Sequence, residues 1–141
     1  MPEQGELFEP SSPLAMLLAA TGPHDDPIAA ARGLVVGLSD DQKVATLNAH
    51  PRIGERPDRL SALSRAEQAG LGADLAAEFE ALNDEYERRF GFRFVVFVNR
   101  RPRARIAVEM RERMKRSRDQ EMEEGLKAVV DIAEDRLRGA P

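Results

Sequence analysis

The chain has 141 residues, 42% of them hydrophobic and 33% charged, with a formal net charge of −4, which is typical of one soluble domain with a buried core. It contains no cysteine, so disulfide scaffolds, thiolate metal sites and cysteine nucleophiles are excluded. No apolar stretch approaches the roughly 20 residues of a membrane span, and the start of the chain lacks the basic and apolar regions of a secretory signal, so we expect a cytoplasmic protein without membrane contact.

Three short helices are predicted in the first third of the chain. Ser12 and Asp26 each precede a proline, and this pair of residues is typical of a helix N-cap followed by a proline in the first turn. Ser39 and Gln42 have the spacing of a capping box, in which each side chain accepts a hydrogen bond from the other residue's backbone amide. The third helix should stop before Pro51, because a proline disfavours helical geometry in the residue that precedes it.

Longer helices are predicted in the second half of the chain. The 52–63 stretch is rich in turn-forming residues and predicts a surface connection. From about 74 to 90 the apolar residues recur at steps of three and four, which is the pattern of an amphipathic helix, and Gly91 closes it. Pro102 opens the next helix, and a capping box that starts at Ser117 begins the last one. The inner faces of these helices are predicted to comprise Leu75, Phe79, Leu82, Tyr86, Phe90, Ile106, Met110, Met114, Met122, Leu126, Val129, Ala133 and Leu137.

Residues 92–98, with the sequence FRFVVFV, are the exception to the helical pattern. Their β-branched and aromatic side chains favour a strand. No other segment offers a partner strand, however, and a lone strand leaves its backbone groups unpaired. We therefore predict a buried extended segment lodged between helices, with main-chain donors and acceptors free to meet another group, such as a ligand.

The fold predicted by these patterns is all-α. We expect a single domain over residues 1–141, built as one compact helical bundle with one buried extended segment. No internal repeat, low-complexity tract or linker divides the chain. The ends, residues 1–10 and 139–141, are expected to be frayed.

Two histidines are the first candidates for chemistry. His24 lies in a polar turn and is expected to face solvent. His50 follows a helix, where the negative end of the helix dipole favours the imidazolium, and Pro51 fixes the direction of the chain beside it. His50 is either a capping or packing residue or an acid–base group. The sequence has no HExxH pattern and no second histidine at ligand spacing, so we expect no metal site.

A second cluster comprises Ser64, Arg65, Ala66, Glu67 and Gln68. The S-x-x-E spacing is first of all a capping box, and spacing alone supports nothing more. A helix N-terminus also presents free amides to an anionic group. Glu67 would then be placed to accept a proton or the hydrogen bonds of a ureido group.

Arg136 lies beside the apolar stripe of the last predicted helix. An arginine in that position usually extends into solvent or pairs with an acid. Alternatively, it projects its planar fork into a cavity and binds a carboxylate or a ureide. Motifs for hydrolase triads, nucleotide phosphates and calcium loops are absent from the sequence.

Cationic side chains concentrate between Arg88 and Arg118, where twelve of them face two acids. Such a block is either a solvated helix face that includes a few arginines for an anionic small molecule, or a surface for nucleic acid or an acidic partner. Aromatic residues interleave with it only at its start, so we favour the first interpretation and do not expect nucleic-acid binding.

Several segments taken together resemble the OHCU decarboxylase family, where OHCU is 2-oxo-4-hydroxy-4-carboxy-5-ureidoimidazoline. They are LNAHPRIGE, the S-x-x-E-Q of Ser64 to Gln68, LNDEYERRFGFRFVVFV and a closing AEDRL. Each segment is short, but their order and separations are specific. The similarity extends from about Phe8 to Leu137.

The resemblance implies an all-helical carboxy-lyase that removes CO2 from OHCU to give (S)-allantoin during urate degradation. It implies no metal or organic cofactor and, as the family is often dimeric, a homodimer. Carried over by position, His50 is the catalytic histidine and Glu67 is its acidic companion, while the backbone of 94–98 holds the ligand. The substrate-binding residues would be Pro51, Ser64, Arg65, Ala66, Glu67, Gln68, Phe94, Val95, Val96, Phe97, Val98 and Arg136.

Two departures from the family pattern leave other functions open. Asn99 to Pro102 replace a small glycine-containing turn, and the loop between His50 and Ser64 is short. One alternative is a diverged relative that binds another ureide, with or without catalysis. The other is a non-enzymatic helical module that binds nucleic acid or an acidic partner through residues 88–118.

Overall fold

The computed structural model describes residues 7–53 and 73–139, in which helices are joined by turns and one extended segment. The all-α fold predicted from the sequence is confirmed, and the described residues contain no β-strand. No helix within these two ranges is both long and apolar enough to cross a membrane. The helices are α2 (Pro13–Thr21), α3 (Pro27–Val36), α4 (Asp40–Asn48), α6 (Ala73–Phe90), α7 (Arg103–Arg113) and α8 (Arg118–Gly139).

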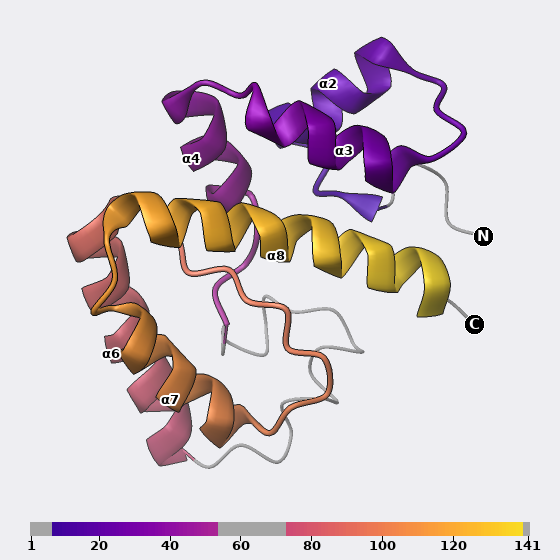
Figure 1. Cartoon of the computed structure of the whole chain (residues 1–141). Helices are drawn as coiled ribbons and strands as arrows, with labels where there is room; N and C mark the ends of the chain where they lie inside the picture. Colours follow the sequence, from indigo (N-terminus) through magenta and orange to yellow (C-terminus); the bar gives the residue numbers. More distant parts are fainter. Residues whose placement is uncertain (1–6, 54–72, 140–141) are drawn as a thin grey trace.

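Helix α8 runs through the middle of the fold (Figure 1). Helices α2, α3 and α4 pack together on one side, with α3 and α4 in contact with α8. Helices α6 and α7 pair on the other side. The extended segment 92–98 connects α6 to α7 and passes close to α8, so it is enclosed by helices as predicted.

The helix boundaries follow the local signals in the sequence. The Ser12 side chain accepts a hydrogen bond from the amide of Ala15 at the start of α2. Ser39 and Gln42 form the reciprocal capping box of α4, and Ser117 and Gln120 form the same arrangement before α8. After α6, Gly91 has a φ of 82°, a left-handed conformation that glycine adopts without strain.

Aromatic side chains fill the core between α6 and the extended segment. The ring of Tyr86 lies 4.6 Å from that of Phe90 and 5.2 Å from that of Phe94, measured between centroids. Phe92 contacts the same cluster, and all four side chains are buried. Burial of three aromatic side chains from residues 90–94 explains why this stretch is held inside the bundle without strand partners.

Helices α4 and α8 approach each other closely at Gly125. A Cβ atom at this position would lie 2.8 Å from Cδ2 of Leu47, a contact shorter than real Cβ atoms make. The absence of a side chain therefore lets α8 pack directly against α4. This contact fixes the position of α4, the helix that leads into His50.

The prediction of a frayed amino-terminal segment over residues 1–10 is wrong for the part that the structure describes. Leu7 and Phe8 are 1% and 2% exposed and belong to the core. Their apolar side chains gain more from burial than the backbone loses in freedom. At the other end, α8 extends through Gly139, one residue into the segment expected to be frayed.

Candidate active site

His50 lies two residues beyond the end of α4 and is buried, with 6% of its surface exposed. Its backbone amide donates to the carbonyl of Leu47 (3.2 Å), which continues the turn of the helix. The adjacent Pro51 is exposed. The sequence therefore places an imidazole inside the protein at the point where the chain leaves α4.

The protonation state of His50 differs from the sequence-based expectation. Burial lowers the pKa of the imidazole, and the positive charge of Arg136 lowers it further, to about 4. We expected the helix dipole to favour the imidazolium, but this effect is small beside the loss of hydration. His50 is accordingly neutral at pH 7 and can accept a proton.

Arg136, in the last two turns of α8, lies within electrostatic range of His50. Its Nη1 atom donates to the carbonyl of Leu7 (3.1 Å), and its Nη2 atom lies 3.7 Å from a carboxylate oxygen of Glu9. The guanidinium is partly exposed, with 42% of the side chain accessible. The fold thus brings together the imidazole and the guanidinium that the sequence singled out, from two distant parts of the chain.

The chain around His50 is held by an arginine that the sequence analysis missed. Nη1 of Arg93 donates to the carbonyls of His50 (2.8 Å) and Asn48 (2.9 Å), and the Arg93 amide donates to the Asn48 side chain (2.9 Å). This residue ties the start of the extended segment to the end of α4. The only feature of the sequence that indicates a role for Arg93 is its position directly before Phe94, the first residue of the predicted ligand-binding segment.

Helix α6 holds the residues that follow His50. Arg52 donates to the carboxylates of Glu87 (2.7 Å) and Asp84 (2.8 Å), and these hydrogen bonds, with Glu87 contributing most, raise the pKa of Arg52. The Asn83 side chain donates to the carbonyl of Ile53 (2.9 Å). Asp84 and Glu87 lie three positions apart on one face of α6, and this spacing is the only feature of the sequence that indicates how Arg52 is held.

The segment Phe94–Val98 has partners for some of its main-chain groups but not for others. The carbonyl of Val95 accepts from Arg113 (3.2 Å), and the carbonyls of Phe97 and Val98 accept from Arg101 (2.7 and 3.0 Å). The prediction of free acceptors is therefore wrong for these three residues. The backbone amides of 94–98, in contrast, make no hydrogen bond within the described part of the chain, as predicted for the donors.

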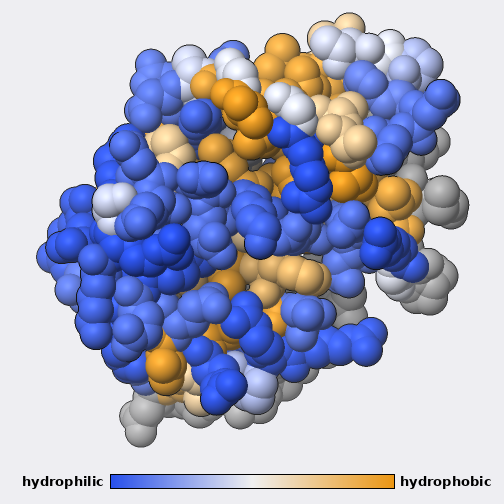
Figure 2. All heavy atoms as spheres, in the orientation of Figure 1, coloured by the Kyte–Doolittle hydropathy of each residue, from blue (hydrophilic) through white to orange (hydrophobic). Residues whose placement is uncertain are grey.

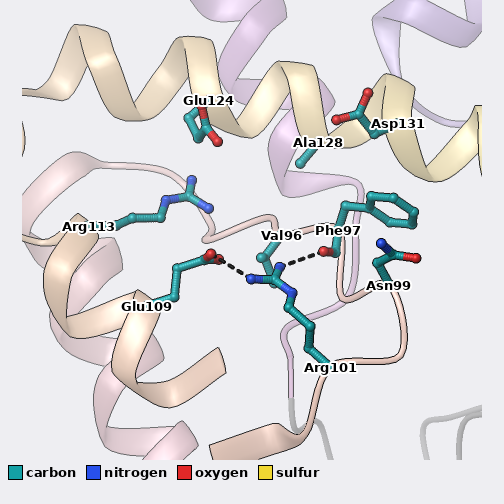
Figure 3. Close-up of a pocket in the computed structure, with 9 residues that line it drawn as sticks. All are labelled: Val96, Phe97, Asn99, Arg101, Glu109, Arg113, Glu124, Ala128 and Asp131. Carbon is teal, nitrogen blue, oxygen red and sulfur yellow. Dashed lines mark hydrogen bonds and ion pairs between the residues drawn. The ribbon is translucent and has the colours of Figure 1, made fainter. Parts of the chain in front are cut away.

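A pocket of about 220 Å³ lies where Arg101 and Arg113 meet this segment (Figure 3). Two of the predicted substrate-binding residues, Val96 and Phe97, line it, whereas His50, Pro51 and Arg136 do not. It is lined by Val96, Phe97, Asn99, Arg101, Glu109, Arg113, Glu124, Ala128 and Asp131.

The remaining predicted site residues, Ser64, Arg65, Ala66, Glu67 and Gln68, lie outside the described residues. Their roles stay predictions. Among the residues described, no three His, Asp or Glu side chains are grouped in a way that could hold a metal ion. The described residues therefore offer a neutral buried imidazole within electrostatic range of a guanidinium, a pair that suits proton transfer on a small anionic molecule.

Four of the twelve cations in the basic block of residues 88–118 bind backbone carbonyls of the chain itself. Arg93, Arg101 and Arg113 bind backbone carbonyls, as described above, and Arg118 donates to the carbonyl of Phe90 (3.0 Å) and to Asp40 (3.1 Å). A nucleic-acid surface requires free cationic side chains along one face. The engagement of these four arginines with backbone carbonyls disfavours that alternative.

The chain is similar to proteins of known family. The family described as OHCU decarboxylase matches residues 3–138. A 2-oxo-4-hydroxy-4-carboxy-5-ureidoimidazoline decarboxylase of Haloferax volcanii is 34% identical, over 94% of this chain and 83% of its own length. The uric acid degradation bifunctional protein PucL of Bacillus subtilis is 30% identical over 94% of this chain, which spans 28% of that longer protein.

Solved structures show the same fold. A crystal structure of OHCU decarboxylase in the presence of (S)-allantoin superposes with a TM-score of 0.79, covering 99% of this chain and 98% of that one at 23% identity. A crystal structure of (S)-allantoin synthase superposes with a TM-score of 0.70, covering 96% of this chain and 47% of that one at 24% identity. The helical arrangement in Figure 1 is therefore shared with both.

Proposed function

Because the chain belongs to the OHCU decarboxylase family, we propose that it converts OHCU to (S)-allantoin and CO2 in urate degradation. The single observation that supports this function best is the buried, neutral His50 within electrostatic range of Arg136. A reaction that moves one proton on an anionic ring needs both groups at one site.

The substrate itself determines what the protein must do. The carboxyl and hydroxyl groups of OHCU share one ring carbon, and the ureido group is on the next. When the bond to the carboxylate breaks, CO2 leaves and its electron pair forms a C=C bond to the ureido-bearing carbon. The electrons of the adjacent C=N bond move to the ring nitrogen, which takes up one proton from solvent. Allantoin forms when the hydroxyl loses its proton to become a carbonyl and the ureido-bearing carbon gains a proton. This sequence balances with the substrate as its own electron sink, so the proposal involves no cofactor.

His50 is proposed to carry that proton. A neutral imidazole accepts the hydroxyl proton as the carbonyl forms, and the resulting imidazolium donates to the ring carbon. Proton transfer by a positioned group accelerates reactions by about 10²–10⁴-fold. Delivery from one fixed side of the ring gives a single enantiomer. Glu67 is proposed to orient His50 and to stabilise its transient positive charge.

The other predicted residues are proposed to hold the substrate. Arg136 binds the carboxylate or the ureido group with its planar fork. The unpaired amides of Phe94–Val98 donate to the ring carbonyls, Pro51 forms one wall, and Ser64–Gln68 contribute further hydrogen bonds. Positioning of this kind can supply several kcal/mol of the barrier reduction.

The proposed function is tested by supplying the substrate directly. OHCU is generated fresh from urate by the two upstream enzymes, and the circular dichroism of the allantoin formed is followed with and without this protein. Rapid formation of the S enantiomer alone supports the function. A slow, racemic signal that is unchanged by the protein would refute it.

The assembly is proposed to be a homodimer, as the resemblance implies, and its compartment is proposed to be the cytoplasm, as expected from the sequence. Figure 2 shows apolar side chains gathered over α2 and α3 on an otherwise hydrophilic face. The exposed apolar side chains of these two helices include Met16 of α2, 59% exposed, and Val36 of α3, 78% exposed. Sedimentation equilibrium should give twice the chain mass, and a monomer at all concentrations would contradict the proposed assembly.

A further inference from the structure

Arg113, in the last turn of α7, is an arginine buried against the extended segment, with 7% of its side chain exposed. Its Nε atom donates to Glu121 of α8 (2.8 Å), and its Nη1 atom donates to the carbonyl of Val95 (3.2 Å). The guanidinium also lies 4.5 Å from the ring centroid of Phe94. One side chain therefore restrains two consecutive residues of the segment and anchors them to α8.

Glu121, the residue of α8 that holds Arg113, is itself held by a side chain of a third helix, α6. Glu121 is fully buried, and the same carboxylate oxygen that binds Arg113 accepts a hydrogen bond from the hydroxyl of Tyr86 on α6 (2.6 Å). Burial, together with the hydrogen bond to Glu121, raises the pKa of Tyr86 far above its usual range, so the hydroxyl remains a donor. Side chains from α6 and α7 thus bind the same carboxylate oxygen of Glu121 on α8.

Arg101 restrains the other end of the same segment through the carbonyls of Phe97 and Val98 (Figure 3). Its remaining Nη1 atom pairs with Glu109 (2.8 Å). The two arginines together engage three carbonyls between Val95 and Val98, whereas the amides of 94–98 have no hydrogen-bond partner among residues 7–53 and 73–139. Arg101 is 38% exposed, whereas Arg113 acts from within the core.

We infer that Arg113 is a positioning residue for the reaction: it fixes the Phe94–Val95 backbone so that the amides of 94–98 are oriented toward the substrate, without touching the substrate itself. A buried ion pair contributes little net stability compared with apolar side chains of similar size, so stability alone does not explain the Arg113–Glu121 pair. The planar guanidinium bonds Glu121 and Val95 in two directions at once, which an ammonium group cannot do. This inference rests on the proposed function, which assigns these amides to the substrate.

The test compares Arg113→Lys with Arg111→Lys, a matched change on the same helix. Arg111 pairs with Glu78 and makes no hydrogen bond to the extended segment. Because backbone amides would bind substrate and transition state alike, loss of their positioning should raise KM more than it lowers kcat. We expect Arg113→Lys to raise the KM for OHCU at least tenfold and to increase the mobility of the 94–98 amides in ¹⁵N relaxation. Arg111→Lys should match the wild type in both measurements.

A second variant separates positioning from folding. Arg113→Met with Glu121→Gln removes the buried charge pair and the bond to Val95, while the amide oxygen of the glutamine still accepts the hydrogen bond of Tyr86. It should fold and show the same rise in KM and the same mobile amides. A folded variant of either kind with wild-type KM and unchanged amide signals would overturn the inference, as would failure of both variants to fold.

Different experimental results would refute the positioning role of Arg113 and the proposed function. If the wild-type chain does not convert OHCU, the proposed function is refuted, and with it the link between Arg113 and the substrate. If the wild type converts OHCU but the 94–98 amides of Arg113→Lys behave like those of the wild type, the function stands and the positioning role is refuted.

Discussion

The guanidinium of Arg136, near the carboxyl end of α8, lowers the pKa of His50, which follows α4. His50 is buried, and salt screens the charges around a buried group much less than it screens exposed charges. The two residues are brought together because α4 and α8 pack closely where Gly125 meets Leu47.

The pH profile of the reaction should report a neutral imidazole. The profile of kcat/KM reflects groups in the free enzyme, and the pKa of His50 there is about 4. Activity should therefore stay constant as pH falls from 8 to 6 and should decline only as pH approaches 4. Stopped-flow measurement with fresh OHCU checks this. A decline centred near 6.5, the value of an unperturbed histidine, would contradict the assignment.

The stability of the protein should depend on pH through the same residue. His50 is neutral in the folded state but takes up a proton near pH 6.5 when unfolded, so between about pH 6.5 and 4 the unfolded state binds more protons and stability falls as pH falls. Between pH 7 and 5 the wild type should lose about 2 kcal/mol more than His50→Gln. Urea unfolding at both pH values measures the difference. Parallel losses in the two proteins would show that His50 does not titrate in this way.

Arg136→Lys should weaken substrate capture. The change keeps the positive charge, so the acid limb of the pH profile should stay near 4, but an ammonium group cannot reproduce the planar fork. We expect a KM about tenfold higher, the cost of roughly one lost charge-assisted hydrogen bond. Arg138→Lys, an exposed neighbour on the same helix that pairs with Glu134, is the matched control. An unchanged KM in Arg136→Lys would remove this arginine from the site.

Arg93→Lys should impair turnover by releasing the chain at His50. The arginine holds the carbonyls of Asn48 and His50 together, and one ammonium group cannot replace all of these bonds. Misplacement of a catalytic group by 1 Å can cost about 10²-fold, so kcat should fall by about ten- to hundredfold. Arg88→Lys, at an exposed position late in α6, should have wild-type kinetics. Wild-type kcat in Arg93→Lys would show that His50 is positioned without it.

The sequence was sufficient to predict the helices because their signals are local. Ser39 with Gln42 and Ser117 with Gln120 each satisfy backbone donors within one turn, whatever the rest of the chain does. The burial of Leu7 and Phe8 could not be predicted in this way, since it depends on apolar surface that is completed by distant helices.

The electrostatics of the site could not be predicted for the same reason. The dipole of α4 is visible in the sequence, but the burial of His50 and its proximity to Arg136 arise only when α8 packs on α4. Likewise, composition identified the basic block but not which arginines turn inward. Nothing in the sequence distinguishes Arg93 and Arg113 from the other arginines of that block. Their roles follow from the backbone carbonyls that lie beside them in the fold.

The most direct measurement of the central claim uses the only two histidines in the chain. His50→Asn and His24→Asn are compared for (S)-allantoin formation from fresh OHCU and for thermal midpoint. His24 bonds Thr21 and the Leu18 carbonyl in a turn between α2 and α3. We predict that His50→Asn stays folded and leaves only the slow racemic reaction, while His24→Asn retains full stereoselective activity. A folded His50→Asn protein that still produces (S)-allantoin at the wild-type rate would contradict the account.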